Sequence, residues 1–201
     1  KHRRRQRQMC IRDRFYTFYS MFGFQRTADQ VWAAADSRAR GFLMGATAGR
    51  TTLNGEGLQH QDGHSLLMAS AVPGCRAWDP AYAYELATII RHGINEMWGN
   101  NMDVIHYIML YNENQQQLPK PKGADHGIIK GAYMVQKSDS NDSPDVRILG
   151  SGPILQYALE AASLLLSEHG VSSEVWSVTS YGELRRDCLL YTSDAADDDA
   201  C

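Results

Sequence analysis

Two histidines and two carboxylates are clustered in a polar, glycine-rich stretch, "GRTTLNGEGLQHQDGHS", at residues 49–65. The four side chains belong to Glu56, His60, Asp62 and His64. Histidine can hydrogen-bond or exchange protons near neutral pH, and glycines let the backbone pass close to a ligand. These residue types therefore predict a binding or acid–base site. A solvated surface loop is the alternative.

More specific chemistries find less support in the same region. His60 and His64 are four residues apart, which on a helix would direct both imidazoles toward one zinc ion. The intervening "QDG" disfavours a helix, so zinc is the weaker interpretation. "GATAGRTT" at residues 45–52 is one residue short of a phosphate loop and has Arg50 in place of its lysine. Cys75 has no evident base beside it, and the sequence holds no GxSxG motif for a serine nucleophile.

The composition is that of ordinary globular protein. Of the 201 residues, 43% are hydrophobic and 21% charged, and the net charge is -3. No run reaches the roughly 18 apolar residues that a membrane span needs, and the basic start is followed by no apolar stretch typical of a secretory signal. We therefore expect a cytoplasmic protein that binds neither membrane nor nucleic acid. The cysteines lack CxxC spacing and are expected to be reduced thiols: Cys10, Cys75, Cys188 and Cys201.

The two ends differ sharply in composition from the middle of the chain. The basic "KHRRRQRQ" could bind nucleic acid, and the acidic tail could be an interaction segment. However, "QMCIRDR" and "CLLYTSDAADD" resemble translated sequencing-adapter read-through. Residues 1–14 and 188–201 are therefore predicted to be non-native.

The middle of the chain alternates between helical and strand patterns. Residues 26–41 predict a helix that ends near Gly41, and residues 41–47 predict a short buried strand. A helix is expected over 79–99 with Asp79 as its N-cap. The nearly continuous apolar run at 103–110 is typical of a strand buried on both faces, so a parallel sheet is predicted.

A second unit follows the linker-like stretch at residues 136–145. A strand at 146–152, a helix at 153–170 and a strand at 174–180 predict one βαβ unit. The "GSG" turn after the first strand could hold an anion at the start of the helix, or could be a simple tight turn. The apolar residues expected in register along the helix are Leu155, Leu159, Ala162 and Leu166.

Six blocks follow one another along the chain: "FYSMFGFQR" (18–26), "RGFLMGATAGRTTLNGEGLQHQDGHS" (40–65), "DPAYAYELA" (79–87), "YNENQQQLP" (111–119), "GIIKGAY" (127–133) and "WSVTSYGELRRD" (176–187). In this order they resemble a known family, the homodimeric, decarboxylating first components of pyruvate dehydrogenase complexes. These are thiamine-diphosphate enzymes of the transketolase-like group. The resemblance extends over about residues 15–187.

The resemblance implies an α/β fold with a parallel sheet. Residues 15–143 would be most of the middle domain, which binds the pyrimidine ring, and residues 144–187 the first βαβ unit of a transketolase C-terminal-like domain. The implied cofactors are thiamine diphosphate and Mg²⁺, with the metal and diphosphate site outside this segment. The implied partners are a second subunit in a homodimer, pyruvate, and a lipoyl-bearing dihydrolipoyl acetyltransferase.

Residue by residue, the resemblance assigns roles in an active centre. Tyr19 matches a tyrosine that reaches cofactor and pyruvate, and Phe22 matches the aromatic residue that packs on the aminopyrimidine, although it could be plain core. His60 matches a histidine that hydrogen-bonds the reacting substrate, and His64 is expected to bind substrate beside it. Glu56 matches an active-centre glutamate, although its role could instead be to stabilise the loop.

The chain also departs from the family pattern. The family usually reads "HEDGHSH", whereas this chain has Gln61 and Leu66 in place of a glutamate and a histidine. "YNENQQQLPKPKG" differs from the usual "LNENY", so contacts of this loop carry over poorly. Two alternatives stay open: a catalytically inactive segment that can at most fold and dimerise, and a relative that acts on another 2-oxo acid.

Overall fold

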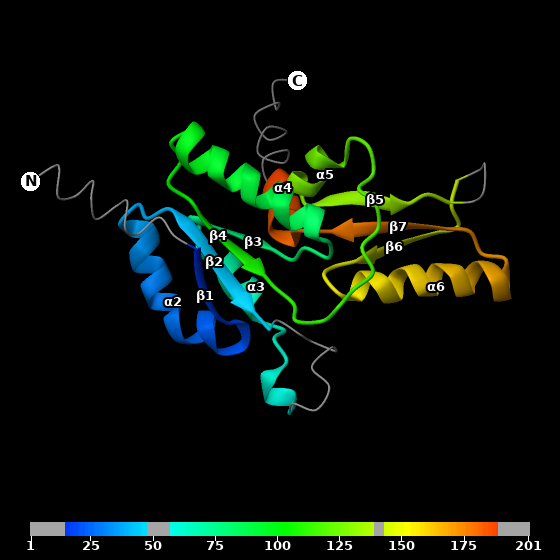
Figure 1. The fold of residues 1–201 in the computed structure, drawn as a ribbon, viewed down its shortest axis with the longest axis horizontal. Coiled ribbons are helices and arrows are strands. Elements are labelled where there is room, and N and C mark those ends of the chain that lie inside the picture. Colours follow the sequence, from blue (N-terminus) through cyan, green and yellow to red (C-terminus); the bar gives the residue numbers. More distant parts are fainter. Residues whose placement is uncertain (1–14, 48–56, 139–142, 189–201) are drawn as a thin grey trace, which may run out of the picture. The chain divides into compact units, whose positions relative to one another are not determined.

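The computed structural model describes residues 15–47, 57–138 and 143–188 (Figure 1). Almost all of the predicted non-native ends lies outside these residues, as does Glu56. The described residues divide into two compact units: those up to Pro80 with Ile89–Gln116, and Ala81–Thr88 with those from Gln117 onward. None of the described helices has the length and apolar character that crossing a membrane requires.

A parallel sheet forms the centre of the first unit. Its strands are β1 (Phe15–Tyr19), β2 (Gly41–Ala46), β3 (Cys75–Trp78) and β4 (Ile105–Met109). They run in the order β1-β2-β4-β3, and every neighbouring pair is parallel. All five residues of β4 are buried. The predicted parallel α/β fold and both predicted strands of this unit are therefore confirmed.

Two helices, α2 (Ser20–Asp36) and α3 (Ser65–Ser70), pack on one face of this sheet. The helix predicted over 26–41 thus begins earlier and ends sooner. It stops because the chain turns at Arg38, whose φ of 56° is left-handed, so that the N–H of Ala39 bonds the carbonyl of Ala34 in place of the next helical bond. The core on this face comprises Phe24, Val31, Ala69, Val72, Cys75, Ala77, Ile105, Tyr107 and Met109.

The helix predicted over 79–99 begins four residues later, as α4 (Ala83–Ile94), and continues into a π-helical turn at Asn95–Gly99. Asp79 is therefore not its N-cap, and this prediction was wrong. The Asp79 carboxylate instead accepts a hydrogen bond from the hydroxyl of Tyr111, which follows β4. Both side chains lie just past the carboxyl ends of their strands.

Glu85 supplies the cap that α4 uses. Its Oε2 accepts the backbone N–H groups of Ala81 and Tyr82 at 2.5 and 3.1 Å, while Oε1 accepts the hydroxyls of Tyr133 and Ser177 at 2.6 and 2.7 Å. Burial raises the pKa of Glu85, and these four donors oppose the rise. Because Glu85 holds the N–H groups of Ala81 and Tyr82 just ahead of the helix, α4 begins at Ala83.

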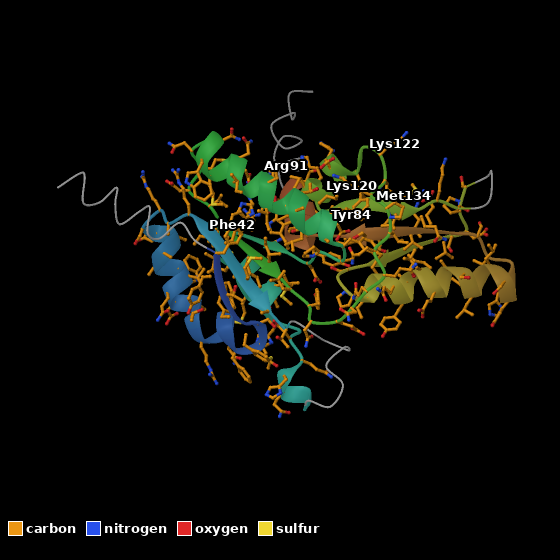
Figure 2. All side chains as sticks on the ribbon, in the orientation of Figure 1. Phe42, Tyr84, Arg91, Lys120, Lys122 and Met134 are labelled. Atoms are coloured by element: carbon orange, nitrogen blue, oxygen red, sulfur yellow. The ribbon has the colours of Figure 1, made fainter. Side chains whose placement is uncertain are left out.

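The second unit contains a mixed three-stranded sheet. Strands β6 (Val146–Gly150) and β7 (Ser173–Val178) are parallel and joined by α6 (Ile154–His169), which confirms the predicted βαβ unit. Strand β5 (Ala132–Gln136) pairs with β7 in antiparallel fashion, and α5 (Ala124–Lys130) precedes it. Met134 on β5 and Tyr84 at the start of α4 are labelled in Figure 2.

The apolar register of α6 holds over only part of the helix. Leu155 and Ala162 are buried, with Tyr82, Ala158 and Val175, but Leu166 is 42% exposed. A helix of 16 residues is roughly 24 Å long, whereas a strand of five or six residues spans roughly 17–20 Å. The last turn of α6 therefore extends past the strands, which is why Leu166 does not join the core.

Candidate active site

Three aromatic rings meet at the carboxyl edge of the parallel sheet. Tyr19 is the last residue of β1, and Phe22 lies in the first turn of α2, three residues on, so both occupy one helix face. Their ring centroids are 5.6 Å apart. The imidazole of His60 stands edge-on to both, 5.9 Å from the Tyr19 ring and 5.6 Å from the Phe22 ring. Three predicted site residues are therefore neighbours.

The cluster of Tyr19, Phe22 and His60 is half-buried, so its rings are accessible to a ligand. The guanidinium carbon of the exposed Arg26 lies 4.7 Å from the centroid of the Phe22 ring. A cation over an aromatic face is attracted by the ring quadrupole. The Phe22 ring is thus in contact with Arg26 of α2 as well as with the rings of Tyr19 and His60.

The loop between the two histidines is not helical. His60 closes a short 3-10 turn at Leu58–His60, and the chain from Gln61 to His64 is irregular before α3 begins. The helical pair of imidazoles that the zinc interpretation requires does not form here. Among residues 15–47, 57–138 and 143–188, no three His, Cys, Asp or Glu side chains gather as possible metal ligands.

Asp62 is the residue that organises this loop. It is fully buried, and its Oδ1 accepts the backbone N–H groups of His64 and Ser65 at 3.2 and 3.0 Å. Its Oδ2 accepts the Ser65 hydroxyl at 2.5 Å. Accepting N–H groups two and three residues on makes an Asx-type turn, which fixes the backbone at His64, the N-cap of α3, and at Ser65, its first residue. The Nδ1 atom of His64 lies 3.8 Å from Oδ1.

The loop is also fastened to the sheet beneath it. The Ser65 hydroxyl lies 3.4 Å from the sulfur of Met109, the last residue of β4. Tyr107, fully buried on the same strand, approaches β2 so closely that a Cβ on Gly45 would lie 2.4 Å from its hydroxyl. Burial raises the pKa of Tyr107, and so does the nearby charge of Asp62. A buried polar group thus underlies the histidine loop.

His64 lies beside this buried group and not in the ring cluster. Its Nε2 atom is buried and has no hydrogen-bond partner within the part of the chain that the structure describes. A polar ligand could form the hydrogen bond that this buried imidazole nitrogen lacks. Glu56, the remaining predicted site residue, lies outside the described residues. The catalytic and binding roles of all five residues stay predictions.

A second polar cluster lies at the opposite, amino edge of the same sheet. The carboxylate of Glu96, in the π-helical turn, is almost fully buried. Arg76 lies 2.9 Å from its Oε1, and His92 and His106 each lie 3.2 Å from its Oε2. Burial raises the pKa of Glu96, but these three partners outweigh it and hold the pKa far below its usual value. Glu96 is therefore ionised.

His106 is the neutral member of that cluster. The indole N–H of Trp78 donates to its Nδ1 at 3.0 Å, so the imidazole proton sits on Nε2 and faces Glu96. Burial lowers the pKa of His106 and outweighs the attraction of Glu96. The imidazole also packs on Phe42, labelled in Figure 2, with ring centroids 5.4 Å apart.

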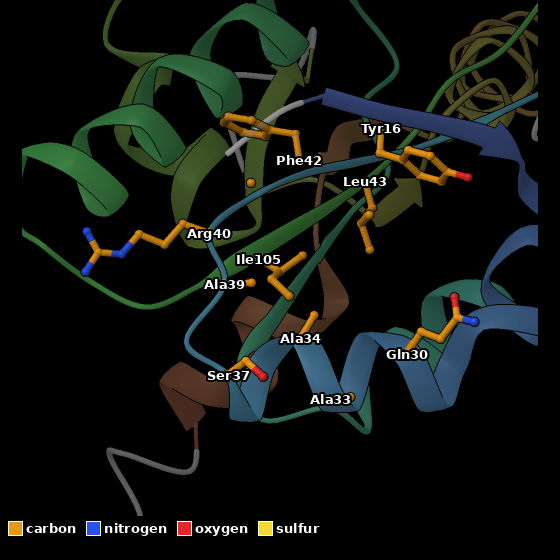
Figure 3. A pocket seen from close by; sticks show the side chains of 11 residues that line it. Tyr16, Gln30, Ala33, Ala34, Ser37, Ala39, Arg40, Phe42, Leu43 and Ile105 are labelled. Atoms are coloured by element: carbon orange, nitrogen blue, oxygen red, sulfur yellow. The ribbon is translucent and has the colours of Figure 1, made fainter. Parts of the chain in front are cut away.

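A hollow of about 530 Å³ opens between α2 and the sheet (Figure 3). It lies at the amino-terminal half of the strands, because Gly41 and Ile105, the first residues of β2 and β4, line it. The ring cluster lies at the carboxyl ends instead. Parallel α/β sheets bind ligands outside the carboxyl ends of their strands, so this hollow is distinct from the candidate active site.

Several solved transketolases have the same arrangement. A transketolase from Campylobacter jejuni aligns with a TM-score of 0.71 and 20% identity, over 86% of this chain and 25% of that chain. A transketolase variant from Pichia stipitis, in complex with fructose-6-phosphate, aligns with a TM-score of 0.70 and 20% identity, over 86% of this chain and 24% of that chain. The chain therefore has a transketolase-like α/β fold.

Sequence relationships identify the family within this fold. Residues 7–118 match the model of the pyruvate dehydrogenase E1 component middle domain, and residues 131–200 match that of the transketolase-like C-terminal domain. The chain belongs to the pyruvate dehydrogenase E1 component family. The predicted resemblance is confirmed, whereas the domain border placed between residues 143 and 144 stays a prediction.

Curated relatives in this family are much longer than the chain. The pyruvate dehydrogenase E1 component of Pseudomonas aeruginosa is 58% identical over 175 residues, which is 87% of this chain and 20% of the relative. That of Escherichia coli is 51% identical over 174 residues, or 86% and 20%. The chain thus spans about a fifth of the length of these relatives.

Proposed function

We propose that the full-length protein containing this segment decarboxylates pyruvate and reductively acetylates the lipoyl group of a dihydrolipoyl acetyltransferase. The observation that carries the proposal is the meeting of Tyr19, Phe22 and His60 at the carboxyl edge of the sheet, in a chain of this family. Loops at that edge are where parallel sheets bind ligands.

The described residues fit thiamine diphosphate, which we propose as cofactor together with Mg²⁺. Tyr19 and Phe22 present half-buried aromatic faces that suit the flat aminopyrimidine ring. When bound, the cofactor supplies a carbon nucleophile and an electron sink for decarboxylation. We assign the diphosphate and Mg²⁺ to residues outside this segment.

His60 has the chemistry required at the substrate. As the keto carbon of pyruvate is attacked, negative charge develops on its oxygen, and an imidazole N–H can donate to that oxygen. Edge contacts with Tyr19 and Phe22 hold the imidazole in one orientation, so little reorganisation is needed during the reaction. We propose the same donor role, at the substrate carboxylate, for the buried Nε2 of His64.

The proposed setting is a cytoplasmic homodimer. This assignment rests on the family to which the chain belongs. Two alternatives remain for comparison: a related enzyme that acts on another 2-oxo acid, and a segment that associates without activity. One chain of the same fold, at 18% identity and a TM-score of 0.62, is described as the inactive beta4 tetramer of a split-gene transketolase.

Substrate scope separates these possibilities. Release of CO₂ from pyruvate, 2-oxobutyrate and 2-oxoglutarate is measured with the full-length protein, with and without thiamine diphosphate, and acetylation of an isolated lipoyl domain is followed by mass spectrometry. We expect kcat/KM to be highest for pyruvate, to depend on the cofactor, and to be accompanied by lipoyl acetylation. A higher kcat/KM for another 2-oxo acid, or CO₂ release that does not require thiamine diphosphate, would contradict the proposal.

A further inference from the structure

Asp62 is a buried carboxylate to which the proposed chemistry assigns no role. Its side chain is fully buried, and its two oxygens accept three hydrogen bonds from the two residues that begin α3, His64 and Ser65. Burying a carboxylate is costly unless donors surround it. A buried carboxylate with this set of donors holds the backbone that supplies them in one conformation.

The location of Asp62 shows which conformation it fixes. It stands two residues after His60 and two before His64, in irregular chain that has no ladder or helix hydrogen bonds of its own. His60 is anchored on one side by the 3-10 turn, through its N–H and the carbonyl of Gly57 at 2.9 Å. On the other side, the Asp62 carboxylate fixes the backbone at His64 and Ser65.

The Asp62 anchor connects this loop to the rigid sheet. Ser65, which donates to Oδ2, also contacts the sulfur of Met109 at the end of β4. Tyr107 on the same strand is fully buried beneath the loop. The carboxylate therefore transmits the position of a central strand to the segment that carries His60.

We propose that Asp62 is a positioning residue that holds the imidazole of His60 against Tyr19 and Phe22 by bonding the backbone at the start of α3 and fastening the histidine loop to β4. The expected loss of kcat rests on the proposed function. The expected displacement of the His60 imidazole does not. Misplacing a catalytic group by about 1 Å can lower a rate by roughly 100-fold.

Substitutions at Asp62 and Ser65 remove different parts of this hydrogen-bonded anchor. Asp62→Asn keeps one oxygen that can accept the two backbone N–H groups, whereas Asp62→Ala removes every acceptor. Ser65→Ala removes only the hydroxyl that joins Oδ2 to β4. The expected order of effect is therefore Asp62→Ala, then Ser65→Ala, then Asp62→Asn.

Two readouts test the proposal in the full-length protein. The first is the rate at which diethylpyrocarbonate modifies His60, followed by peptide mass spectrometry, because the ring neighbours shield the imidazole. The second is the split between kcat for pyruvate and the Kd of thiamine diphosphate. For Asp62→Ala we expect at least fivefold faster labelling and a kcat lower by roughly 10- to 100-fold, with Kd within about threefold of the parent protein. Asp62→Asn is expected to stay within about threefold in all three quantities.

Glu96→Gln is the matched control, because it also disturbs a buried carboxylate of the same unit but at the opposite edge of the sheet. Its His60 labelling and kcat are expected to match the parent protein.

Unchanged labelling in Asp62→Ala, equally faster labelling in Glu96→Gln, or a lower kcat accompanied by an equally large rise in Kd would each overturn the proposal. If Asp62→Ala does not fold, Ser65→Ala and Asp62→Asn decide by the same criteria. An inactive parent protein would contradict the proposed function alone, since His60 labelling still tests the positioning.

Discussion

The imidazole of His60 meets the ring of Phe22 edge-on, at an interplanar angle of 88° and a centroid separation of 5.6 Å. One residue comes from the first turn of α2 and the other from the loop after β2. They meet because β1 and β2 are paired in parallel, with Tyr19 opposite Ala46 at the carboxyl ends. Strand pairing thus brings together side chains that the sequence separates widely.

Phe22→Leu in the full-length protein is expected to weaken thiamine diphosphate binding, because a flat ring loses its stacking partner. The loss should be about 1 kcal/mol, or roughly fivefold in Kd. Quenching of tryptophan fluorescence during cofactor titration measures it.

Phe24→Leu is the control, on the same helix and with the same change of side chain. Phe24 is fully buried and packs on Tyr107, so its substitution should lower the free energy of unfolding by about 1–2 kcal/mol. Cofactor affinity should not change. Equal affinity loss in both variants would refute a binding role for Phe22.

Glu96→Gln is expected to destabilise the first unit, because the half-buried Arg76 would lose the anionic partner that the almost fully buried Glu96 supplies. Removing one member of a buried ion pair costs about 3 kcal/mol. Hydrogen exchange of the β4 amides reports the local opening free energy. Glu113→Gln, at an exposed glutamate of the same unit, should leave that exchange unchanged.

Acidification is expected to weaken the first unit in two stages. The pKa of His106 is lowered from 6.5 in the folded state, so the unfolded chain binds the proton more readily and stability falls below about pH 6.5. The pKa of Glu96 is lowered from 4.5, so a second loss begins as pH falls below that value. Exchange of β4 amides between pH 4 and pH 8 measures both.

His106→Gln isolates the first stage. This variant lacks the buried imidazole, so its stability should change less than that of the parent protein between about pH 6.5 and pH 4.5. Identical slopes in the two proteins would show that His106 does not contribute.

Tyr133→Phe is expected to loosen the second unit. The substitution removes the hydroxyl that donates to Glu85 at 2.6 Å and leaves a buried carboxylate with one donor fewer. The expected loss is about 1–3 kcal/mol, seen as faster exchange of the β7 amides. Tyr157→Phe, at a side chain that is 52% exposed, should have no effect, and equal effects would contradict this role of Tyr133.

Strands and helices with a strong apolar pattern could be predicted from the sequence. The runs that became β2 and β4 are nearly continuous, and the βαβ unit of β6, α6 and β7 has clear turns at each end. Strands β1, β3 and β5 were not predicted. Strand β1 is mostly exposed, β3 has only four residues, and β5 has one buried residue. Their pairing with neighbouring strands, and not their own pattern, makes them strands.

Helix ends depended on contacts that no local pattern reveals. Asp79 followed by Pro80 is typical of a helix start, but the donors around Glu85 come partly from β5 and β7, far along the chain. In the Glu96 cluster, the contact between His92 and Glu96 is the one that helical spacing indicates, because these residues are four apart.

The ring cluster could be predicted only through the family resemblance, since spacing alone indicated no more than a candidate loop. The anchoring role of Asp62 did have a local signal. Asp62 stands two residues before His64 and three before Ser65, the spacing at which an Asp side chain accepts backbone N–H groups in an Asx-type turn. The polar character of the loop obscured this short helix, α3.

The most direct test of the account is the effect of His60→Ala on pyruvate decarboxylation by the full-length protein at saturating thiamine diphosphate, with His126→Ala, at an exposed histidine of α5, as the control. We expect kcat to fall by roughly 100-fold in His60→Ala, cofactor Kd to stay within about threefold, and the control to match the parent protein. An unchanged kcat in His60→Ala would contradict the account, because the ring cluster would then not be the place where pyruvate reacts.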